Sequence, residues 1–293
     1  IKMSKEGLVC KNVHKNYKKT EVLKGLDLIL EKGKIYGLIG RNGAGKSTTF
    51  KAILGLIRLN GGKVLIDGKQ PQDLKAAEKE NIGVVLSDSG FCGYMTVKDV
   101  ILTMNAMYKK FDKADFLAKC EQFKLPLNQK IKEFSTGMKA KLKVLLAMSH
   151  GAKLLILDEP TSGLDVVVRN QILDLLREYM EKDEENSILI SSHISSDLEG
   201  LCDDVYFIEN GKIILHEETD TLMDAYGILK VTPEQYQKLE QEYILCTKKD
   251  KYGYTCLTNQ KQYFIENYPD IVIEKSEIDE IITLMLSDRK EGK

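Results

Sequence analysis

The feature that most constrains this chain is a glycine-rich loop between an apolar segment and a helix. The loop reads Gly-Arg-Asn-Gly-Ala-Gly-Lys-Ser over residues 40–47, which fits the pattern G-x-x-x-x-G-K-[ST]. Glycines let backbone N–H groups surround a polyphosphate, and the N-terminus of the following helix adds a partial positive charge. We therefore predict nucleotide binding, in which Lys46 reaches the β- and γ-phosphates and the Ser47 hydroxyl faces Mg²⁺. The residues expected to contact the nucleotide here are Gly40, Arg41, Asn42, Gly43, Ala44, Gly45, Lys46, Ser47 and Thr48.

The composition argues against several other classes of protein. Hydrophobic residues make up 43% and charged residues 30% of the 293 positions, as in an ordinary globular protein. Lys and Arg number 43 against 44 Asp and Glu, so the chain lacks the basic excess of a nucleic-acid-binding protein. No apolar run approaches the ~20 residues that span a bilayer, and no secretory signal is recognisable. We expect Met3 to be the native start, because Ile1 and Lys2 precede it.

Apolar runs alternate with helical patterns over the first two thirds of the chain. This alternation favours an α/β fold with a mainly parallel sheet. Four consecutive apolar residues at 154–157 are typical of a strand buried on both faces. Residues 48–57 have the pattern of the start of a helix, and helical spacing dominates from Val97 to about Gln122. Strands are expected at 34–39, 61–68, 81–86, 154–157, 187–191, 205–209 and 212–215, the last two joined as a hairpin across Asn210-Gly211.

The pattern changes near Asp220. Beyond this point the expected order is strand, helix, strand, strand, helix, strand, which is the split βαβ arrangement, followed by a last helix from Ser276. Ile278, Ile281, Ile282 and Met285 recur at helical spacing and predict an apolar docking face. We therefore predict an α/β nucleotide-binding domain at 3–222, with a helical subdomain at about 88–150, and a small α+β domain at 226–293.

Two acids follow the buried run at 154–157. At the C-terminal end of a parallel strand, Asp158 can hold the Mg²⁺ shell. Glu159 lies one residue further and can act as general base towards an attacking water. Two solvated acids at a strand end would be the alternative interpretation, which the glycine-rich loop in the same chain disfavours.

The order of motifs resembles the nucleotide-binding subunits of ABC transporters over about residues 5–220. The loop at 40–47 is followed by Phe-Ser-Thr-Gly-Met at 134–138, which is similar to the family's signature L-S-G-G-Q. Asp-Glu-Pro-Thr-Ser-Gly-Leu-Asp at 158–165 and Ser-Ser-His at 191–193 then match its remaining motifs. The resemblance implies a P-loop NTPase cassette, with a RecA-like core, an antiparallel β subdomain and a helical subdomain.

The resemblance also implies a mechanism that needs two copies of the chain, or one copy and a homologous subunit. Each copy would bind ATP and Mg²⁺ on its own P-loop, with the Tyr17 ring stacked on adenine. The partner's signature would cover the γ-phosphate through the Ser135 hydroxyl and the Gly137 N–H. His193 would contact the γ-phosphate beside Glu159, and Asp165 would couple the two sites across the dimer.

Two departures from the family pattern stand out. The family usually has glutamine, a Mg²⁺ contact, after the strand at 82–86, whereas this chain has Ser87 followed by Asp88. Serine is too short to play the same part directly, so Asp88, or a water held by Ser87, is expected to substitute. In the signature, Thr136 adds a side chain where the backbone approaches phosphate, which predicts a looser site.

The variant signature, Lys-Leu-Pro-Leu at 124–127 and the added C-terminal domain resemble small bacterial export ATPases. This group exports bacitracin-like antibiotics, lantibiotics and phenol-soluble modulin peptides, and the last class is most similar. The resemblance implies a separate transmembrane permease, so the chain would be soluble when isolated and otherwise held at the cytoplasmic face of the membrane. We predict that Phe91, Tyr94 and Met95 line a groove for a helix of that permease.

Two other functions within the superfamily remain open from the sequence. A translation or DNA-repair ATPase would carry a second cassette or a long coiled-coil insertion, and the balanced charge argues against a nucleic-acid partner. A regulatory module that binds ATP without turnover would not need Glu159 and His193.

Overall fold

The computed structural model describes residues 6–291, with side chains through residue 287. The predicted start at Met3 lies outside the described residues. Contacts within the chain divide it into two compact units, which are described separately. Unit 1 comprises residues 1–202 and 206–215, and unit 2 comprises residues 203–205 and 216–293.

A six-stranded sheet forms the centre of unit 1. The first four strands in its order are parallel to their neighbours, as the buried apolar runs predicted. The carboxyl ends of parallel strands lie at the same edge of a sheet, so the loops that follow β3, β6 and β7 meet there. The order across the sheet is β5 (Ile82–Val85), β6 (Leu154–Asp158), β7 (Ser187–Ser192), β3 (Ile35–Ile39), β8 (Asp204–Glu209) and β9 (Lys212–Glu218).

The β8–β9 hairpin turns at Asn210-Gly211, as predicted. Both residues have positive φ, 48° and 78°, which is the requirement of a two-residue type I′ turn. The turn also supports the glycine-rich loop, because the Gly211 N–H donates to the Ala44 carbonyl at 2.9 Å.

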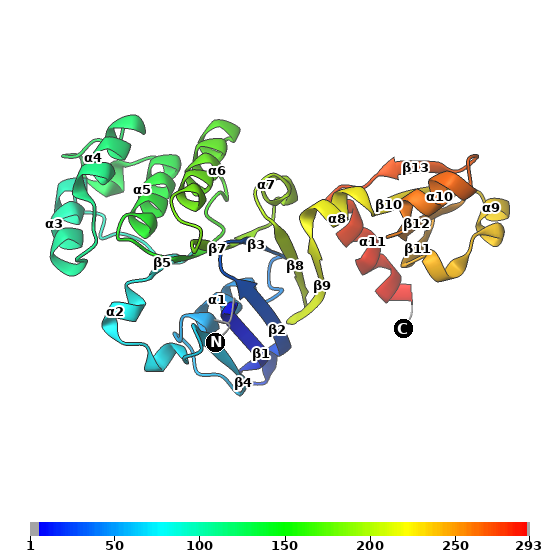
Figure 1. Cartoon of the computed structure of the whole chain (residues 1–293), viewed down its shortest axis with the longest axis horizontal. Coiled ribbons are helices and arrows are strands. Elements are labelled where there is room, and N and C mark those ends of the chain that lie inside the picture. Colours follow the sequence, from blue (N-terminus) through cyan, green and yellow to red (C-terminus); the bar gives the residue numbers. More distant parts are fainter. Residues whose placement is uncertain (1–5, 292–293) are drawn as a thin grey trace. The chain divides into compact units, whose positions relative to one another are not determined.

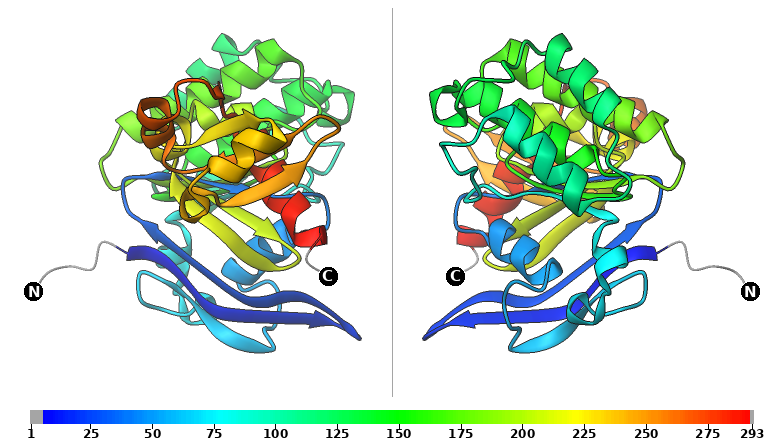
Figure 2. Two further views of the ribbon diagram at one scale, coloured as in Figure 1. Left: turned by 90° about the vertical axis from the view of Figure 1, so that its right-hand side faces the viewer. Right: turned by 90° about the vertical axis from the view of Figure 1, so that its left-hand side faces the viewer.

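A second, antiparallel sheet lies at one end of unit 1, and four helices gather at the opposite end (Figures 1 and 2). The antiparallel order is β2 (Thr20–Glu31), β1 (Glu6–Tyr17) and β4 (Gly61–Ile66). The helix after the glycine-rich loop, α1 (Lys46–Ile53), is shorter than predicted because Gly55 leaves the helical region at φ +66°. Short elements at Pro71–Asp73 and α2 (Ala76–Lys79) lead to β5.

The segment at 97–122, where helical spacing dominates, forms two helices, α3 (Val97–Met107) and α4 (Lys113–Gln122). The break has a local cause, since the Asp112 side chain accepts from the Asp115 N–H and begins a new helix. The remaining elements are a 3-10 turn (Ile131–Glu133), α5 (Thr136–Met148), α6 (Val166–Glu181) and α7 (Ser195–Glu199).

Unit 2 has the predicted split βαβ order. Its antiparallel sheet runs β11–β12–β10–β13, so the first strand lies between the third and the fourth. Ile278, Ile281 and Ile282 are buried on the last helix, which packs on β11 and β12. Its elements are α8 (Thr219–Asp224), β10 (Gly227–Val231), α9 (Pro233–Lys238), a 3-10 turn (Gln241–Tyr243), β11 (Cys246–Lys249), β12 (Tyr254–Thr258), α10 (Lys261–Asn267), β13 (Val272–Lys275) and α11 (Ile278–Glu291).

Across residues 6–291, none of the helices combines the length and the apolar content that crossing a bilayer demands.

Candidate nucleotide-binding site

The glycine-rich loop has the backbone that its glycines were expected to allow. Gly45 lies at φ +117°, a conformation that L side chains rarely adopt. A Cβ on Gly40 would lie only 2.5 Å from the Ile208 carbonyl oxygen of β8. The loop is therefore fitted closely against the sheet beneath it, and larger residues at these two positions would displace it.

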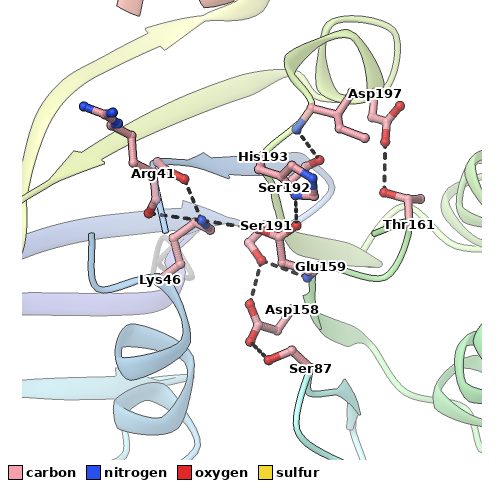
Figure 3. A network of polar contacts seen from close by, with 12 residues as sticks. Arg41, Lys46, Ser87, Asp158, Glu159, Thr161, Ser191, Ser192, His193 and Asp197 are labelled. Atoms are coloured by element: carbon pink, nitrogen blue, oxygen red, sulfur yellow. Dashed lines mark hydrogen bonds and ion pairs between the residues drawn. The ribbon is translucent and has the colours of Figure 1, made fainter. Parts of the chain in front are cut away.

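Lys46 is held inside this loop and faces the acids at the end of β6. Its side chain is 6% exposed, and its Nζ donates to the Gly40 carbonyl at 2.6 Å. The same Nζ lies 3.3 Å from Glu159 Oε1 (Figure 3). Burial at the N-terminus of α1 leaves this ammonium directed towards anions at the edge of the sheet.

Asp158 ends β6 and is almost fully buried, with 1% of its surface exposed. Hydroxyl groups satisfy both of its carboxylate oxygens. Ser87 Oγ donates to Oδ2 at 2.8 Å, and Ser191 Oγ donates to Oδ1 at 2.8 Å. No cation neutralises this carboxylate among the contacts of the described residues, so its negative charge can act on a metal ion.

Glu159 follows in a constrained conformation. Its φ is +52°, and a non-glycine residue in this region costs on the order of 1–3 kcal/mol unless its surroundings impose it. Here the Glu159 N–H donates to Ser191 Oγ at 2.9 Å, and the side-chain Oε2 lies 2.5 Å from His193 Nδ1. The carboxylate thus lies between Lys46 and His193, as Figure 3 shows.

These groups surround one cavity of about 1190 Å³. Residues 41–43 and 45–48 of the loop line it, together with Ser87, Asp158, Glu159 and His193. Gly40 and Ala44 support the loop from below, since Ala44 is buried in the core of unit 1. Tyr17 also lines the cavity, is 44% exposed, and has Lys15 Nζ 4.8 Å from its ring centroid. The predicted base-stacking residue is therefore on the correct side of the loop for that role.

The oxygen atoms at one wall of this cavity suit Mg²⁺. Ser47, Asp158 and Ser87 offer two hydroxyls and one carboxylate, and Mg²⁺ is commonly bound by one or two carboxylates together with substrate phosphates. Among the described residues, no group of three or more His, Cys, Asp or Glu side chains is arranged to hold a metal ion by itself. The site therefore fits Mg²⁺ that arrives with nucleotide.

Ser87, not Asp88, contacts Asp158, because the Ser87 Oγ donates to its carboxylate directly. That a water held by Ser87 takes the part of the family's glutamine towards Mg²⁺ stays a prediction. Asp88 turns instead to Lys51 of α1, 2.6 Å away, and this hydrogen bond holds the pKa of the Asp88 carboxyl below its usual value. The turn itself is closed by Ser89, whose Oγ donates to the Leu86 carbonyl at 2.8 Å.

Replacing Ser87 with alanine is expected to weaken Mg²⁺ binding by roughly ten- to a hundredfold, the usual effect of removing a partner of a metal ligand. Asp158 then loses a donor and the metal loses a neighbouring oxygen. Titrating Mg²⁺ against a fluorescent ATP analogue measures the effect without turnover. Ser196→Ala on the exposed side of α7 is the control. An unchanged Mg²⁺ titration for Ser87→Ala would contradict the assignment.

Ser135, Gly137 and Asp165 are not among the residues that line the cavity within the described part of the chain. Ser135 caps α5, accepting from the Met138 N–H at 3.2 Å, and Asp165 caps α6, accepting from the Val168 N–H at 3.0 Å. The two helix starts are neighbours, since a Cβ on Gly137 would lie 3.1 Å from Val168 Cγ1.

Of the three residues expected to form a groove, only Tyr94 is openly exposed, at 72%. Lys132 Nζ lies 4.7 Å from its ring centroid. Phe91 and Met95 pack partly buried against the helical core, and Phe91 also borders a separate cavity of about 240 Å³ beside Val84 of the sheet's edge strand.

Sequence reasoning did not identify the roles of Ser191 and Asp197. Ser191 was recognised only as part of a motif, yet it joins Asp158 to the Glu159 backbone. Asp197 carries no motif, and a buried acid four residues after a histidine has no distinctive pattern. Both roles depend on which strand ends meet in space, which spacing alone does not reveal.

Comparisons with known proteins agree with this geometry. Residues 23–162 match the family model described as "ABC transporter". The ABC transporter ATP-binding protein YtrB of Bacillus subtilis is 34% identical over 70% of each chain. The lantibiotic transport ATP-binding protein SrtF of Streptococcus pyogenes is also 34% identical, over 73% of this chain and 91% of that protein.

Among solved structures, an ATP-binding subunit of an ABC transporter superposes with a TM-score of 0.66. It is 27% identical, and the match covers 73% of this chain and 91% of that one. The fold, the order of motifs and these relatives all point to one family.

Proposed function

The chain belongs to the ABC transporter ATP-binding proteins, which are ATPases, and on that premise we propose that it drives export through a separate permease in a bacterium. The observation that carries the proposal is the convergence of Lys46, Asp158, Glu159 and His193 on one cavity. These are the groups that bind and hydrolyse ATP. Their joint presence supports an enzyme that turns over rather than a regulatory module that only binds.

We propose that each catalytic site is completed by a second copy of the chain or by a homologous subunit. Ser135 and Gly137 lie at the N-terminus of α5 and are not among the described lining residues of the cavity of their own molecule, although Thr136 between them is. A helix N-terminus with free donors favours an anion such as the γ-phosphate. In a head-to-tail dimer, the signature of each copy, with Ser135 and Gly137, would cover the ATP bound to the other copy. Asp165 would then lie at the interface between the two copies.

The residues of this chain then divide the chemistry among them. The loop and Lys46 hold the phosphates, while Asp158, Ser47 and Ser87 would hold Mg²⁺, whose charge would offset that of the phosphates. Glu159 accepts a proton from water as the water oxygen attacks the γ-phosphorus, and the bond to the bridging oxygen breaks to release ADP. His193 orients Glu159 and contacts the γ-phosphate, stabilising the charge that develops there.

The proposed cargo is a peptide or an antibiotic-like molecule. The relation to a lantibiotic transport protein supports this class, and the sequence pattern favours amphipathic peptides of the phenol-soluble modulin type. The test is to co-express the chain with the small membrane protein encoded beside it and to assay ATP-dependent uptake of such peptides into inverted vesicles. Uptake that needs ATP and both proteins would support the proposal. A chain that neither associates with a membrane protein nor supports uptake would exclude it.

We further propose that the permease contacts the exposed surface around Tyr94 and thereby holds the chain at the cytoplasmic face of the membrane. Tyr94 lies seven residues beyond Ser87. A movement of the loop that contains Tyr94 would therefore pass through the few residues to Ser87, and from its hydroxyl to Asp158, the acid proposed to bind the metal. A protruding aromatic ring of this kind is typical of an interface anchor.

Replacing Tyr94 with aspartate is expected to reduce transport at least about tenfold, since loss of an interface anchor costs about 1–2 kcal/mol or more. Basal ATP hydrolysis should stay within about twofold, because Tyr94 is not among the lining residues of the described cavity. Vesicle uptake and phosphate release measure the two effects. Tyr252→Asp is a matched control, since that ring is 81% exposed and also carries a lysine, Lys251, 5.2 Å from its centroid. Equal transport by Tyr94→Asp and wild type would contradict the proposed contact.

We also propose which part of the chain carries each function. We assign ATP binding and permease contact to residues 3–222, with the helical subdomain at about 88–150 carrying the permease surface. Residues 226–293 form the accessory α+β domain.

A further inference from the structure

Asp197 is a buried acid that the chemistry described above does not use. It lies on α7, four residues after His193, and only 4% of its surface is exposed. It is absent from the residues described as lining the nucleotide cavity. A buried carboxylate is costly unless it is paired and hydrogen-bonded, so its partners should explain its presence.

Both partners of Asp197 come from the segment that follows Glu159. The Thr161 hydroxyl donates to Oδ2 at 2.9 Å, a buried hydrogen bond drawn in Figure 3. On the other side, an Arg169 Nη1 lies 3.6 Å from Oδ1. The second Nη of Arg169 donates to the Leu164 carbonyl at 3.4 Å. One carboxylate therefore fixes both ends of the segment 161–165.

Two hydrogen bonds join the segment that runs from the end of β7 into α7 to the segment that begins at Glu159. Ser191 joins the β7 end to the Glu159 N–H, and Asp197 joins α7 to Thr161. His193 lies between Ser191 and Asp197 along one segment. Glu159 comes just before Thr161 along the other, which continues to Asp165. These two links therefore fix the positions of His193, Glu159 and Asp165 relative to one another.

The polar contacts of the Arg169 guanidinium are long or incomplete. Its ion pair with Asp197 is longer than a good charge-assisted hydrogen bond, and its buried Nε has no partner among the described atoms. A buried donor without a partner is unusual and calls for an explanation. The distance between Arg169 Nη1 and Asp197 Oδ1 is therefore sensitive to the position of segment 161–165.

We propose that Asp197 is a positioning residue that couples Asp165 to His193 and Glu159 of the same chain. A displacement of Asp165 by a neighbouring subunit moves Leu164, and the Arg169–Asp197–Thr161 link carries this movement to the residues beside the γ-phosphate. Asp197 itself touches no substrate. The effect on cooperativity rests on the dimer proposed above, whereas the effect on turnover does not.

The test compares Asp197→Asn with wild type in the full chain. Asparagine keeps an acceptor for Thr161 and removes the charge that faces Arg169. ATP affinity, measured with Mg²⁺ withheld, should stay within about twofold, while kcat falls roughly tenfold and the Hill coefficient for hydrolysis falls from about 2 towards 1.

Thr161→Val should give a change in the same direction, and the double variant should add little, because the two residues share one interaction. Asp174→Asn is the control, since Asp174 is an exposed acid that pairs with Arg177 at 2.6 Å.

Different outcomes separate a positioning role from a structural one. If kcat and the Hill coefficient of Asp197→Asn equal those of wild type, or if activity falls only in proportion to the folded fraction seen by thermal melting, the proposal is wrong. If Asp197→Asn does not fold, Thr161→Val alone decides by the same criteria. Hydrolysis of ATP without cooperativity by the wild-type chain would count against the proposed dimer. In that case, a fall in kcat at unchanged ATP affinity for Asp197→Asn would still test the Arg169–Asp197–Thr161 link. A wild-type chain without turnover would instead exclude the proposed function.

Discussion

Replacing Glu159 with glutamine is expected to lower ATP turnover by about a hundredfold or more, the usual contribution of a positioned general base. The same change should strengthen ATP binding. In the structure the Glu159 carboxylate contacts Lys46 Nζ at 3.3 Å and His193 Nδ1 at 2.5 Å. The γ-phosphate needs both of these groups, so the carboxylate competes with it, and a neutral amide competes less. ATP-bound dimers should therefore accumulate.

Phosphate release measures the turnover, a fluorescent ATP analogue measures the affinity, and light scattering measures the dimer. Glu181→Gln on the exposed end of α6 is a control for the loss of one negative charge. Normal hydrolysis by Glu159→Gln would mean that another group accepts the proton. Weaker ATP binding would mean that the carboxylate does not compete with phosphate.

Replacing Ser135 with arginine is expected to abolish hydrolysis without preventing ATP binding. Ser135 caps α5, is exposed, and is not among the described residues that line the cavity of the P-loop in its own chain. An arginine there would obstruct the one ATP site that this signature covers and remove the hydroxyl from the partner's γ-phosphate. Lys46→Ala should abolish both binding and hydrolysis, because Lys46 holds the phosphates from within the loop.

A mixture of these two inactive variants is expected to regain activity. A dimer that contains one copy of each has one site with an intact P-loop and an intact signature. Random pairing makes half of the dimers of this mixed kind, so up to about a quarter of the wild-type rate should return if each site works alone. As a control, Ser135→Arg mixed with the Ser135→Arg, Lys46→Ala double variant should stay inactive, since no intact site can form. A mixture of the two single variants that stays equally inactive would contradict sites shared between subunits.

The glycine-rich loop, the acids after β6 and the order of strands could be predicted because each depends on local chemistry. A phosphate loop needs glycines at fixed spacing, and a doubly covered strand needs a continuous apolar run. The break between α3 and α4 was missed because the apolar spacing continues through it. The cap formed by Asp112 decides the boundary there, and a single polar residue is a weak signal within a periodic pattern.

The contacts of Ser87, Ser191 and Asp197 were beyond prediction for a different reason. Each joins residues that are tens of positions apart in sequence, such as Ser87 and Asp158. Only the parallel pairing of β5, β6 and β7 places these side chains together. The contact of Ser87 with Asp158 could not be read from side-chain length, because it depends on where the turn after β5 places the serine.

The turn between β8 and β9 limits how the chain can be shortened. Gly211 supports the Ala44 carbonyl and also accepts from the Lys24 N–H at 2.9 Å, so residues far from the N-terminus hold the phosphate loop in shape. A truncated protein intended to isolate the ATPase has to retain the whole hairpin through β9. A cut before Gly211 would leave the loop sequence intact and yet remove the support under it. Reduced nucleotide binding in such a fragment would then report a damaged loop rather than a role for the C-terminal residues in catalysis.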